Sequence, residues 1–250
     1  MNAADAASCE SRARSGAFPT TQWSLVLAAG AGTERQARAA LEVLCRQYWY
    51  PLYSFIRRQS RTHHEAEDCT QEFFARLLAN EGMTHARRER GRFRSFLLTA
   101  LRHFLANESR DAQAAKRGGG AVALPLEIEG AEERFVREPA DPDRTPEQAF
   151  DRNWGLALID QVIAELRSEF VASDRRALFD ALSPLLLGDP GTESLTEPAS
   201  RLGMSRHAFS VALHRVRRRL GENLRTAVAE TVATPAEVDA ELRHLIAAIH

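Results

Sequence analysis

Hydrogen-bonding side chains recur along one face of the segment SLTEPASRLGMSRHAFSVALHRVRRRL, residues 194–220. Between residues 201 and 225, seven arginines stand against one acid, Glu222, so the local charge is about +6. Long basic donors and short polar groups are the side chains that reach phosphates and base edges in the major groove of DNA. The candidate DNA contacts are Arg206, His207, Ser210, His214, Arg215 and Arg218. The alternative is an ordinary helical hairpin with a solvated basic face.

A second group of residues has the chemistry of metal ligands. His63, His64, Glu67 and Asp68 follow one another within six positions, and a metal-dependent enzyme could use such side chains. They crowd the start of a helix, however, and have no HExxH-type spacing with further ligands. We therefore interpret them as surface residues and assign no catalytic residue, metal site or cofactor.

A helix, a tight turn and a second helix must position the basic donors. Gly203 accepts the positive φ that ends a helix, and Ser205 offers a side-chain oxygen to the free amides of a helix starting near Arg206. Pro198 lacks an amide proton, so the first helix should be short and should hold this proline in its first turn. The apolar spacing of the second helix marks its buried side. This stripe consists of Phe209, Ala212, Leu213, Val216, Leu220 and Leu224.

Charge is segregated along the chain, although the net charge is only −1. Residues 87–117 hold nine basic residues and three acids, about +6, whereas residues 119–152 hold nine acids and four arginines, about −5. Two basic blocks therefore flank an acidic connector. The 250 residues, 44% of them hydrophobic, suffice for one large or two small domains.

The three cysteines, Cys9, Cys45 and Cys69, are widely spaced and form no CxxC motif, which favours reduced thiols in the cytosol. The sequence shows no signal peptide and no apolar run long enough to cross a bilayer. We therefore expect a cytoplasmic protein that is neither secreted nor inserted into a membrane.

Helical periodicity runs through the first part of the chain. Residues 1–17 are small and polar and should be disordered, whereas FPTTQWSLVLAA at 18–29 predicts a first helix. Apolar residues between Leu41 and Ile56 keep helical spacing, and Pro51 should kink or break that helix. A helix over 65–78 follows, with one apolar side and an opposite side that either is hydrated or docks a basic partner. The residues of that polar side are Glu65, Glu67, Asp68, Gln71 and Glu72.

The segment GRFRSFLLTALRHFLAN at 91–107 predicts a helix whose phenylalanines share one stripe. Their register indicates core residues in preference to base-stacking platforms. The nucleic-acid candidates are the polar residues off this stripe: Arg92, Arg94, Arg102, His103, Asn107 and Arg110.

Glycine, proline and acids between residues 117 and 150 predict a flexible linker with a brief apolar stretch at 122–128. Helices resume from Trp154 and pack under the basic segment. The sequence Thr234-Pro-Ala-Glu237 is a capping box that opens a C-terminal helix. Because no segment shows strand alternation with hairpin signals, we predict an all-α protein of two small helical domains.

The segment AEDCTQEFFARLL resembles region 2 of bacterial RNA polymerase sigma factors of the extracytoplasmic-function (ECF) group, within the sigma-70 family. Three more blocks are similar in the same order: YPLYSFIRR, GRFRSFLLTALRHFLANESRD and LGMSRHAFSVALHRVRRRL. The resemblance covers about residues 40–116 and 155–225.

The resemblance implies a four-helix domain that binds the β′ clamp helices of core RNA polymerase and opens promoter DNA near the minus-ten element. It also implies a helix-turn-helix domain that reads the minus-thirty-five element and faces the β flap. Residue by residue, it implies polymerase contacts at Asp68, Gln71 and Glu72 and minus-ten contacts at Arg102, Asn107 and Arg110. The minus-thirty-five contacts would be the six candidates from Arg206 to Arg218. A nucleoid-associated protein without enzymatic activity is expected.

The expected domains are a disordered terminus at 1–17, region 2 at 18–116, a linker at 117–150, region 4 at 151–230 and a C-terminal helical extension at 231–250. This extension lies outside the family pattern, and we hypothesise that it packs on the C-terminal domain or holds the free protein closed. An anti-sigma factor or a kinase is left open as the regulator. The alternatives are a stand-alone helix-turn-helix regulator, which binds DNA without polymerase, and a structural helical adaptor.

Overall fold

The structure is a computed structural model that describes residues 34–59, 61–78, 91–114, 130–138, 141, 143–188 and 191–249. Every regular element within these ranges is helical, so the predicted all-α fold class is confirmed there. The helices are α2 (Glu34–Arg57), α3 (His63–Leu78), α4 (Phe93–Ala114), α5 (Ala131–Arg137), α6 (Pro146–Ala172), α7 (Arg176–Leu182), α8 (Thr196–Arg201), α9 (Arg206–Ala229) and α10 (Val238–Ile249). Short 3-10 turns lie at Ser183–Leu185, Thr192–Leu195 and Pro235–Glu237.

None of the described helices combines the length and the apolar character needed to span a bilayer. The helix predicted at 18–29, the predicted disorder of 1–17 and the apolar stretch at 122–128 lie outside the described residues.

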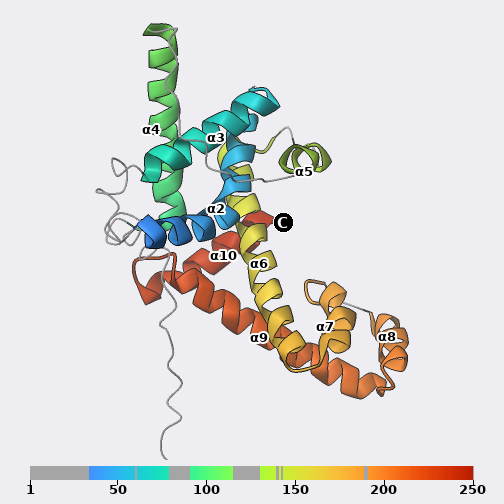
Figure 1. Cartoon of the computed structure of the whole chain (residues 1–250). Coiled ribbons are helices and arrows are strands. Elements are labelled where there is room, and N and C mark those ends of the chain that lie inside the picture. The colour runs from blue at the N-terminus through green and yellow to red at the C-terminus, as the bar shows by residue number, and fades with distance from the viewer. Residues whose placement is uncertain are drawn as a thin grey trace, which may run out of the picture.

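The first of two hydrophobic cores is built around α2, which packs against α3 and the first half of α6 (Figure 1). Trp49 of α2 stacks on Phe74 of α3 with ring centroids 5.8 Å apart. Phe93 and Phe104 of α4 are buried in the same core, and Phe96 packs against it. The aromatic stripe of α4 is therefore structural, as predicted.

Pro51 lies inside α2, which continues through it, so of the predicted kink or break the break is wrong. The proline ring and its neighbours Tyr50, Leu52 and Tyr53 are all buried. A proline inside a helix costs about 3 kcal/mol because one backbone hydrogen bond is lost. The burial of the three large neighbouring side chains offsets that cost. Helix propensity describes the local sequence alone, so it does not include this burial.

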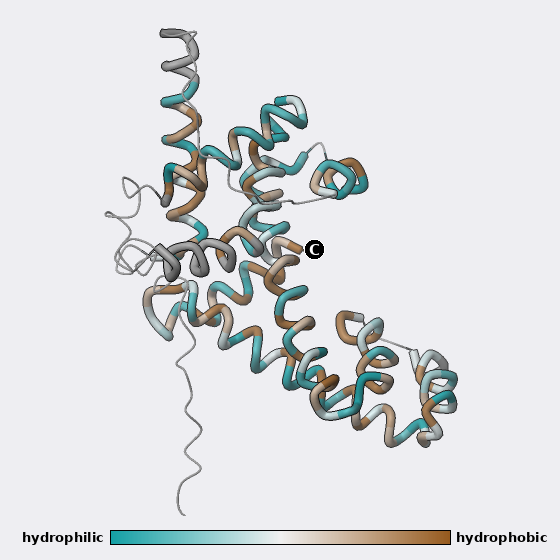
Figure 2. The backbone as a smooth tube through the Cα atoms, in the orientation of Figure 1, coloured by the Kyte–Doolittle hydropathy of each residue, from teal (hydrophilic) through white to brown (hydrophobic). Residues whose placement is uncertain are grey.

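The second core lies between the other half of α6 and the helices α7, α8 and α9. Phe170 at the end of α6 meets Phe179 of α7 with ring centroids 5.3 Å apart. Phe209 and Leu213 of α9 are buried against them, as the stripe of this helix predicts. Figure 2 shows hydrophobic positions recurring along both α6 and α9, as expected of helices that bury one side.

One helix of 27 residues, α6, contributes to both cores. It begins earlier than predicted, because Thr145 accepts a hydrogen bond from the amide of Gln148 while the Gln148 side chain accepts from the amide of Thr145. This capping box, with Pro146 at the first helical position, is a strong start signal. The sequence predicted a flexible linker over 117–150 because of its glycines, prolines and acids. The structure instead has the short helix α5 and the start of α6 within this range.

The C-terminal helix α10 packs against α6 and the end of α9 (Figure 1). Its start is the predicted capping box, with Glu237 accepting from the amide of Thr234. Val238 and Leu245 are buried in the first core, whereas Ile246 is exposed. Between α9 and α10 the carbonyl oxygen of Thr231 accepts a hydrogen bond from the first amide of α4. The C-terminal segment thus completes the first core.

Candidate nucleic-acid interface

Two helices joined by a tight turn, α8 and α9, lie where the sequence predicts them. Gly203 has a φ of 65° at the turn, and the Ser205 hydroxyl accepts a hydrogen bond from the amide of Ala208 at 3.1 Å. Positive φ is open to glycine at little cost, and a serine cap satisfies an otherwise free amide. Pro198 lies in the first turn of the six-residue α8, as expected. The turn therefore fixes where α9 begins, at Arg206.

The polar face of α9 is open to solvent. Phe209, Leu213, Val216 and Leu220 bury the opposite side. Because a helix turns through 3.6 residues, this burial directs the other residues outward. All six predicted DNA contacts are exposed: Arg206, His207, Ser210, His214, Arg215 and Arg218.

Two further arginines of α9 contact other segments of the fold. Arg217 donates hydrogen bonds to the backbone oxygens of Leu185 and Gly188, beyond the end of α7. Arg219 forms an ion pair with Glu169 of α6 at 2.7 Å. The number of charges in the sequence does not distinguish arginines that contact other parts of the protein from arginines that are free to bind a ligand.

The minus-ten candidates lie on α4. Arg102 is exposed and forms an ion pair with Glu147, in the first turn of α6, at 2.5 Å. The hydrogen bond from Arg102 holds the pKa of the Glu147 carboxyl below its usual range. Asn107 is also exposed. Arg110 belongs to α4, but its side chain lies outside the described residues.

Arg94, another predicted nucleic-acid contact on α4, has a different role. Its guanidinium is buried and donates to Glu241 of α10 and to Asp151 of α6, at 2.5 Å in each case. Arg92 pairs with the same Glu241 at 2.9 Å. The prediction that Arg94 faces nucleic acid is wrong, because its guanidinium is buried and each of its three nitrogens donates to a carboxylate.

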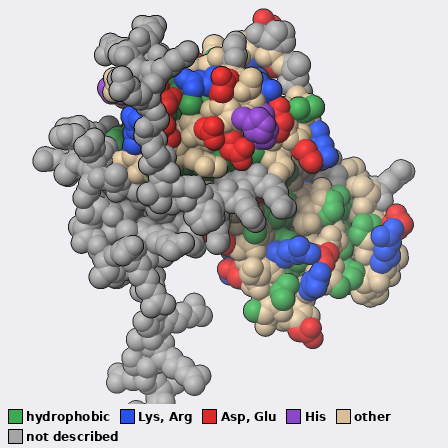
Figure 3. Space-filling view, turned by 45° about the horizontal axis from the view of Figure 1, so that its top comes forward, with side chains coloured by type: hydrophobic (Ala, Val, Ile, Leu, Met, Phe, Trp, Pro, Cys, Tyr) green, Lys and Arg blue, Asp and Glu red, His purple; other side chains and the backbone are tan. Residues whose placement is uncertain are grey.

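An acidic face on α3 is exposed to solvent, as the sequence indicates. Asp68 is exposed, and Gln71 and Glu72 are half-buried. Glu72 forms an ion pair with Arg76 one turn on, at 2.5 Å. Figure 3 shows acidic side chains gathered near histidines on this part of the surface. Such a face has the charge to dock a basic partner.

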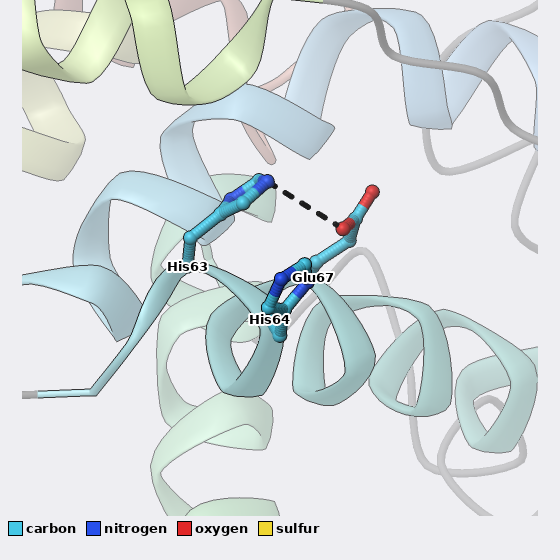
Figure 4. A group of neighbouring side chains, drawn as sticks. All are labelled: His63, His64 and Glu67. Carbon is cyan, nitrogen blue, oxygen red and sulfur yellow. Dashed lines mark ion pairs between the residues drawn. The ribbon is translucent and has the colours of Figure 1, made fainter.

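His63, His64 and Glu67 come together at the start of α3, with ligand atoms within 4.8 Å of one another (Figure 4). Nε2 of His63 lies 3.8 Å from the Glu67 carboxylate. The Tyr53 hydroxyl donates to Glu132, so at 2.9 Å it accepts a hydrogen bond from Nδ1 of His63. The structure brings three of the four metal-ligand candidates together and leaves Asp68 outside the group.

An Arg- and Tyr-rich cluster near the end of α2 was not predicted from the sequence. It consists of Tyr50, Tyr53, Arg57 and Arg58, which we call the α2 patch, and α5 covers it. The signal in the sequence was the adjacent arginine pair in YPLYSFIRR together with the acids of the connector, but no local pattern pairs them across about 80 positions.

Comparison with known proteins places part of this arrangement in a family. Residues 44–115 match the sequence model of the family Sigma-70 region 2. The matched range holds most of α2, all of α3 and α4, and the acidic face of α3. No curated protein and no solved structure matches the chain. Proteins with this region are non-enzymatic initiation factors that bind core RNA polymerase and promoter DNA. The match over residues 44–115 supports a sigma factor of the sigma-70 family, with a part in polymerase binding and promoter recognition.

Proposed function

We propose that the protein is a sigma factor of the ECF group, acting in the bacterial cytoplasm at the nucleoid. The observation that carries this proposal is that a match to Sigma-70 region 2 and a capped helix with an exposed basic face, preceded by a tight turn, occur in one chain. Residues 18–116 would be region 2, residues 151–230 region 4, and residues 231–250 an extension outside the family pattern. The protein supplies sequence preference to polymerase and makes or breaks no covalent bond.

Polymerase binding is assigned to α3. Asp68, Gln71 and Glu72 present an acidic surface that suits a basic partner, and we propose the β′ clamp helices as that partner. Asp68 is the most open of the three residues.

Promoter recognition is divided between two helices. We assign the melted minus-ten strand to Arg102, Asn107 and Arg110 of α4, where capturing unstacked bases offsets an unpairing cost of a few kcal/mol per base. We assign the minus-thirty-five element to the six exposed residues of α9, with the β flap supporting this domain on polymerase. Phosphate contacts give affinity that falls steeply with salt, and base contacts select the sequence.

The first test separates polymerase binding from DNA binding. We expect Asp68→Ala to weaken affinity for core polymerase about tenfold, since interface charges of this kind are worth more than 1 kcal/mol. Asp160→Ala, which removes an exposed aspartate from α6, is the matched control and should leave this affinity unchanged. If Asp68→Ala kept its polymerase affinity and lost DNA binding, the assignment of α3 would be wrong.

The second test is transcription in vitro with core polymerase and a genomic promoter library. We expect Arg215→Ala and His214→Ala to change the preferred upstream element, because each good base contact is worth about 1–3 kcal/mol of discrimination. Arg201→Ala, at an exposed arginine of α8 that pairs with Glu197, is the control. A stand-alone regulator would instead bind an isolated palindromic site tightly without polymerase.

A further inference from the structure

Two histidines and a glutamate meet at the start of α3 (Figure 4). His63 and Glu67 are one helical turn apart and share a face, with Nε2 of His63 3.8 Å from the Glu67 carboxylate. His64 adds a second imidazole, whose ring centre lies 5.1 Å from that of His63. One ligand atom from each residue lies within 4.8 Å of the other two. Imidazole nitrogens and a carboxylate oxygen together are ligands that zinc accepts.

The hydrogen bonds of His63 leave one of its ring nitrogens unprotonated. The Tyr53 hydroxyl gives its proton to Glu132, so its oxygen accepts a hydrogen bond from Nδ1 of His63 at 2.9 Å. A neutral imidazole carries one N–H, and this contact places it on Nδ1. Nε2 therefore keeps its lone pair, and Nε2 is the nitrogen that faces Glu67. At 3.8 Å these two atoms are too far apart for a hydrogen bond.

Tyr53 and Glu132 orient the His63 ring. A metal-binding histidine commonly donates its second ring N–H to a neighbouring group, which fixes the ring and increases the basicity of the ligating nitrogen. Tyr53 is fully buried, so this support comes from the core of the protein. Burial, followed by the hydrogen bond to Glu132, raises the pKa of the phenol, which therefore stays protonated and donates to Glu132. Arg57 in turn holds the Glu132 carboxylate at 2.9 Å.

The spacing of the three residues suits a small ion. Two ligands of a tetrahedral zinc ion lie about 3.4 Å apart, because each is about 2.1 Å from the metal. The separation of His63 and Glu67 is close to this value. His64 is exposed, so its side chain can rotate toward them at little cost. The partial positive charge at the start of α3 opposes a cation, but Glu67 and Glu132 each bring a carboxylate within 3.8 Å of a His63 nitrogen.

We propose that His63, His64 and Glu67 form a surface site for one Zn²⁺ ion, with Tyr53 and Glu132 as positioning residues. Three protein ligands leave the fourth position to water. Imidazole ligands favour zinc over Mg²⁺ and Ca²⁺, which take oxygen ligands. The HExxH-type spacing that this segment lacks concerns ligands on a single helix. The residues that orient His63 come instead from α2 and α5, so the sequence of α3 does not reveal them.

The test is isothermal titration of Zn²⁺ into the untagged full-length protein near neutral pH. We expect one equivalent to bind with a micromolar or lower dissociation constant. His64→Gln and Glu67→Gln should each weaken binding about tenfold or more, because even the partners of metal ligands are worth about 10–100-fold. His64 is exposed and Glu67 is half-buried, so both variants should fold. Unchanged affinity in both variants, or no binding to the wild-type protein, would overturn the proposal.

Matched controls separate this site from general binding to histidines and acids. The chain has eight histidines, and His103→Gln removes an exposed one from α4. Glu133→Gln removes an exposed glutamate from α5. Each control should change the affinity for Zn²⁺ less than about twofold, because neither residue belongs to the site or its support. If the controls weakened binding as much as the ligand variants, or if equimolar Mg²⁺ displaced the zinc, the site would be no more than a charged surface.

Tyr53→Phe tests the positioning role. Loss of the hydroxyl should weaken Zn²⁺ binding about tenfold. Long-range ¹H–¹⁵N NMR spectra identify the ring nitrogen that binds the metal, which a merely structural role of Tyr53 would not change. We expect Nε2 of His63 in the wild-type protein and a mixture of both nitrogens in Tyr53→Phe. Coordination through Nδ1 in the wild type, or an unchanged affinity in the folded variant, would overturn this arrangement. Neither polymerase nor DNA enters these measurements, so the zinc site and the proposed function can fail separately.

Discussion

Arg94 and Glu241 form a buried ion pair across 147 positions of the chain, with a nitrogen–oxygen distance of 2.5 Å. The side chain of Arg94 is 7% exposed and that of Glu241 is fully buried. Burial acts to lower the pKa of Arg94, but the hydrogen bond to Glu241 and the charge of Asp151 outweigh it and raise the pKa. The same Asp151 also binds Nε2 of His244 at 2.8 Å. Helices α4, α6 and α10 are thus joined by one polar cluster at the edge of the first core.

This cluster predicts that Glu241→Gln destabilises the protein strongly. Removing one partner leaves Arg94 buried with an incomplete set of acceptors, which costs about 3–5 kcal/mol. Asp239→Asn is the control on the same helix, because its exposed pair with Arg225 contributes about 0–1 kcal/mol. Urea unfolding of both variants measures the difference. Equal losses for the two would show that burial of the pair has no energetic consequence.

Two glycine substitutions should change stability in opposite directions, because Gly155 of α6 is packed against α10 and Gly221 of α9 is not. A side chain at Gly155 would meet Leu245 of α10 at 2.8 Å and Ile249 at 3.3 Å. We expect Gly155→Val to cost about 1–3 kcal/mol through overpacking. Gly221 on α9 has open space around it, and Gly221→Ala should instead gain about 0.5–1 kcal/mol of helix stability. Thermal unfolding checks both signs, and a stabilising Gly155→Val would contradict the contact.

Acid should release α5 from α2. The hydrogen bond from Arg57 holds the pKa of the Glu132 carboxyl below its usual range. A depressed pKa means that the docking contribution is fully present above the ordinary glutamate pKa of about 4.3 and is lost as pH falls through the lower, folded value. A label at Val136→Cys should therefore gain mobility only below about pH 4.3. In Glu132→Gln this transition should be absent, and release near neutral pH would argue against the pair.

The two described cysteines should resist thiol reagents in the folded protein. Burial raises the pKa of Cys45 to about 12, and burial together with a hydrogen bond to Glu108 raises that of Cys69 to about 12. The thiolate is the reactive form, so little of it exists at pH 8. In a Cys9→Ser variant we expect no reaction with Ellman's reagent until denaturant is added. Rapid labelling of the folded variant would show that one thiol is open to solvent.

The amino-acid sequence by itself determined the local boundaries and the buried faces. Gly203, Ser205 and the Thr234–Glu237 capping box set the ends of helices where predicted, because such signals act within one helical turn. The apolar stripes of α4 and α9 identified core residues for a similar reason, since their spacing follows the helix period. The match to Sigma-70 region 2 likewise covers a continuous stretch, residues 44–115.

The tertiary structure decided which charged residues remain available to a ligand. Arg94, Arg217 and Arg57 look like the other arginines in the sequence, yet each is taken by partners on distant segments. Pro51 stays inside a helix because buried neighbours offset its local cost. Electrostatic energy depends on distance in space and on burial, and neither is encoded in the spacing of residues along one helix.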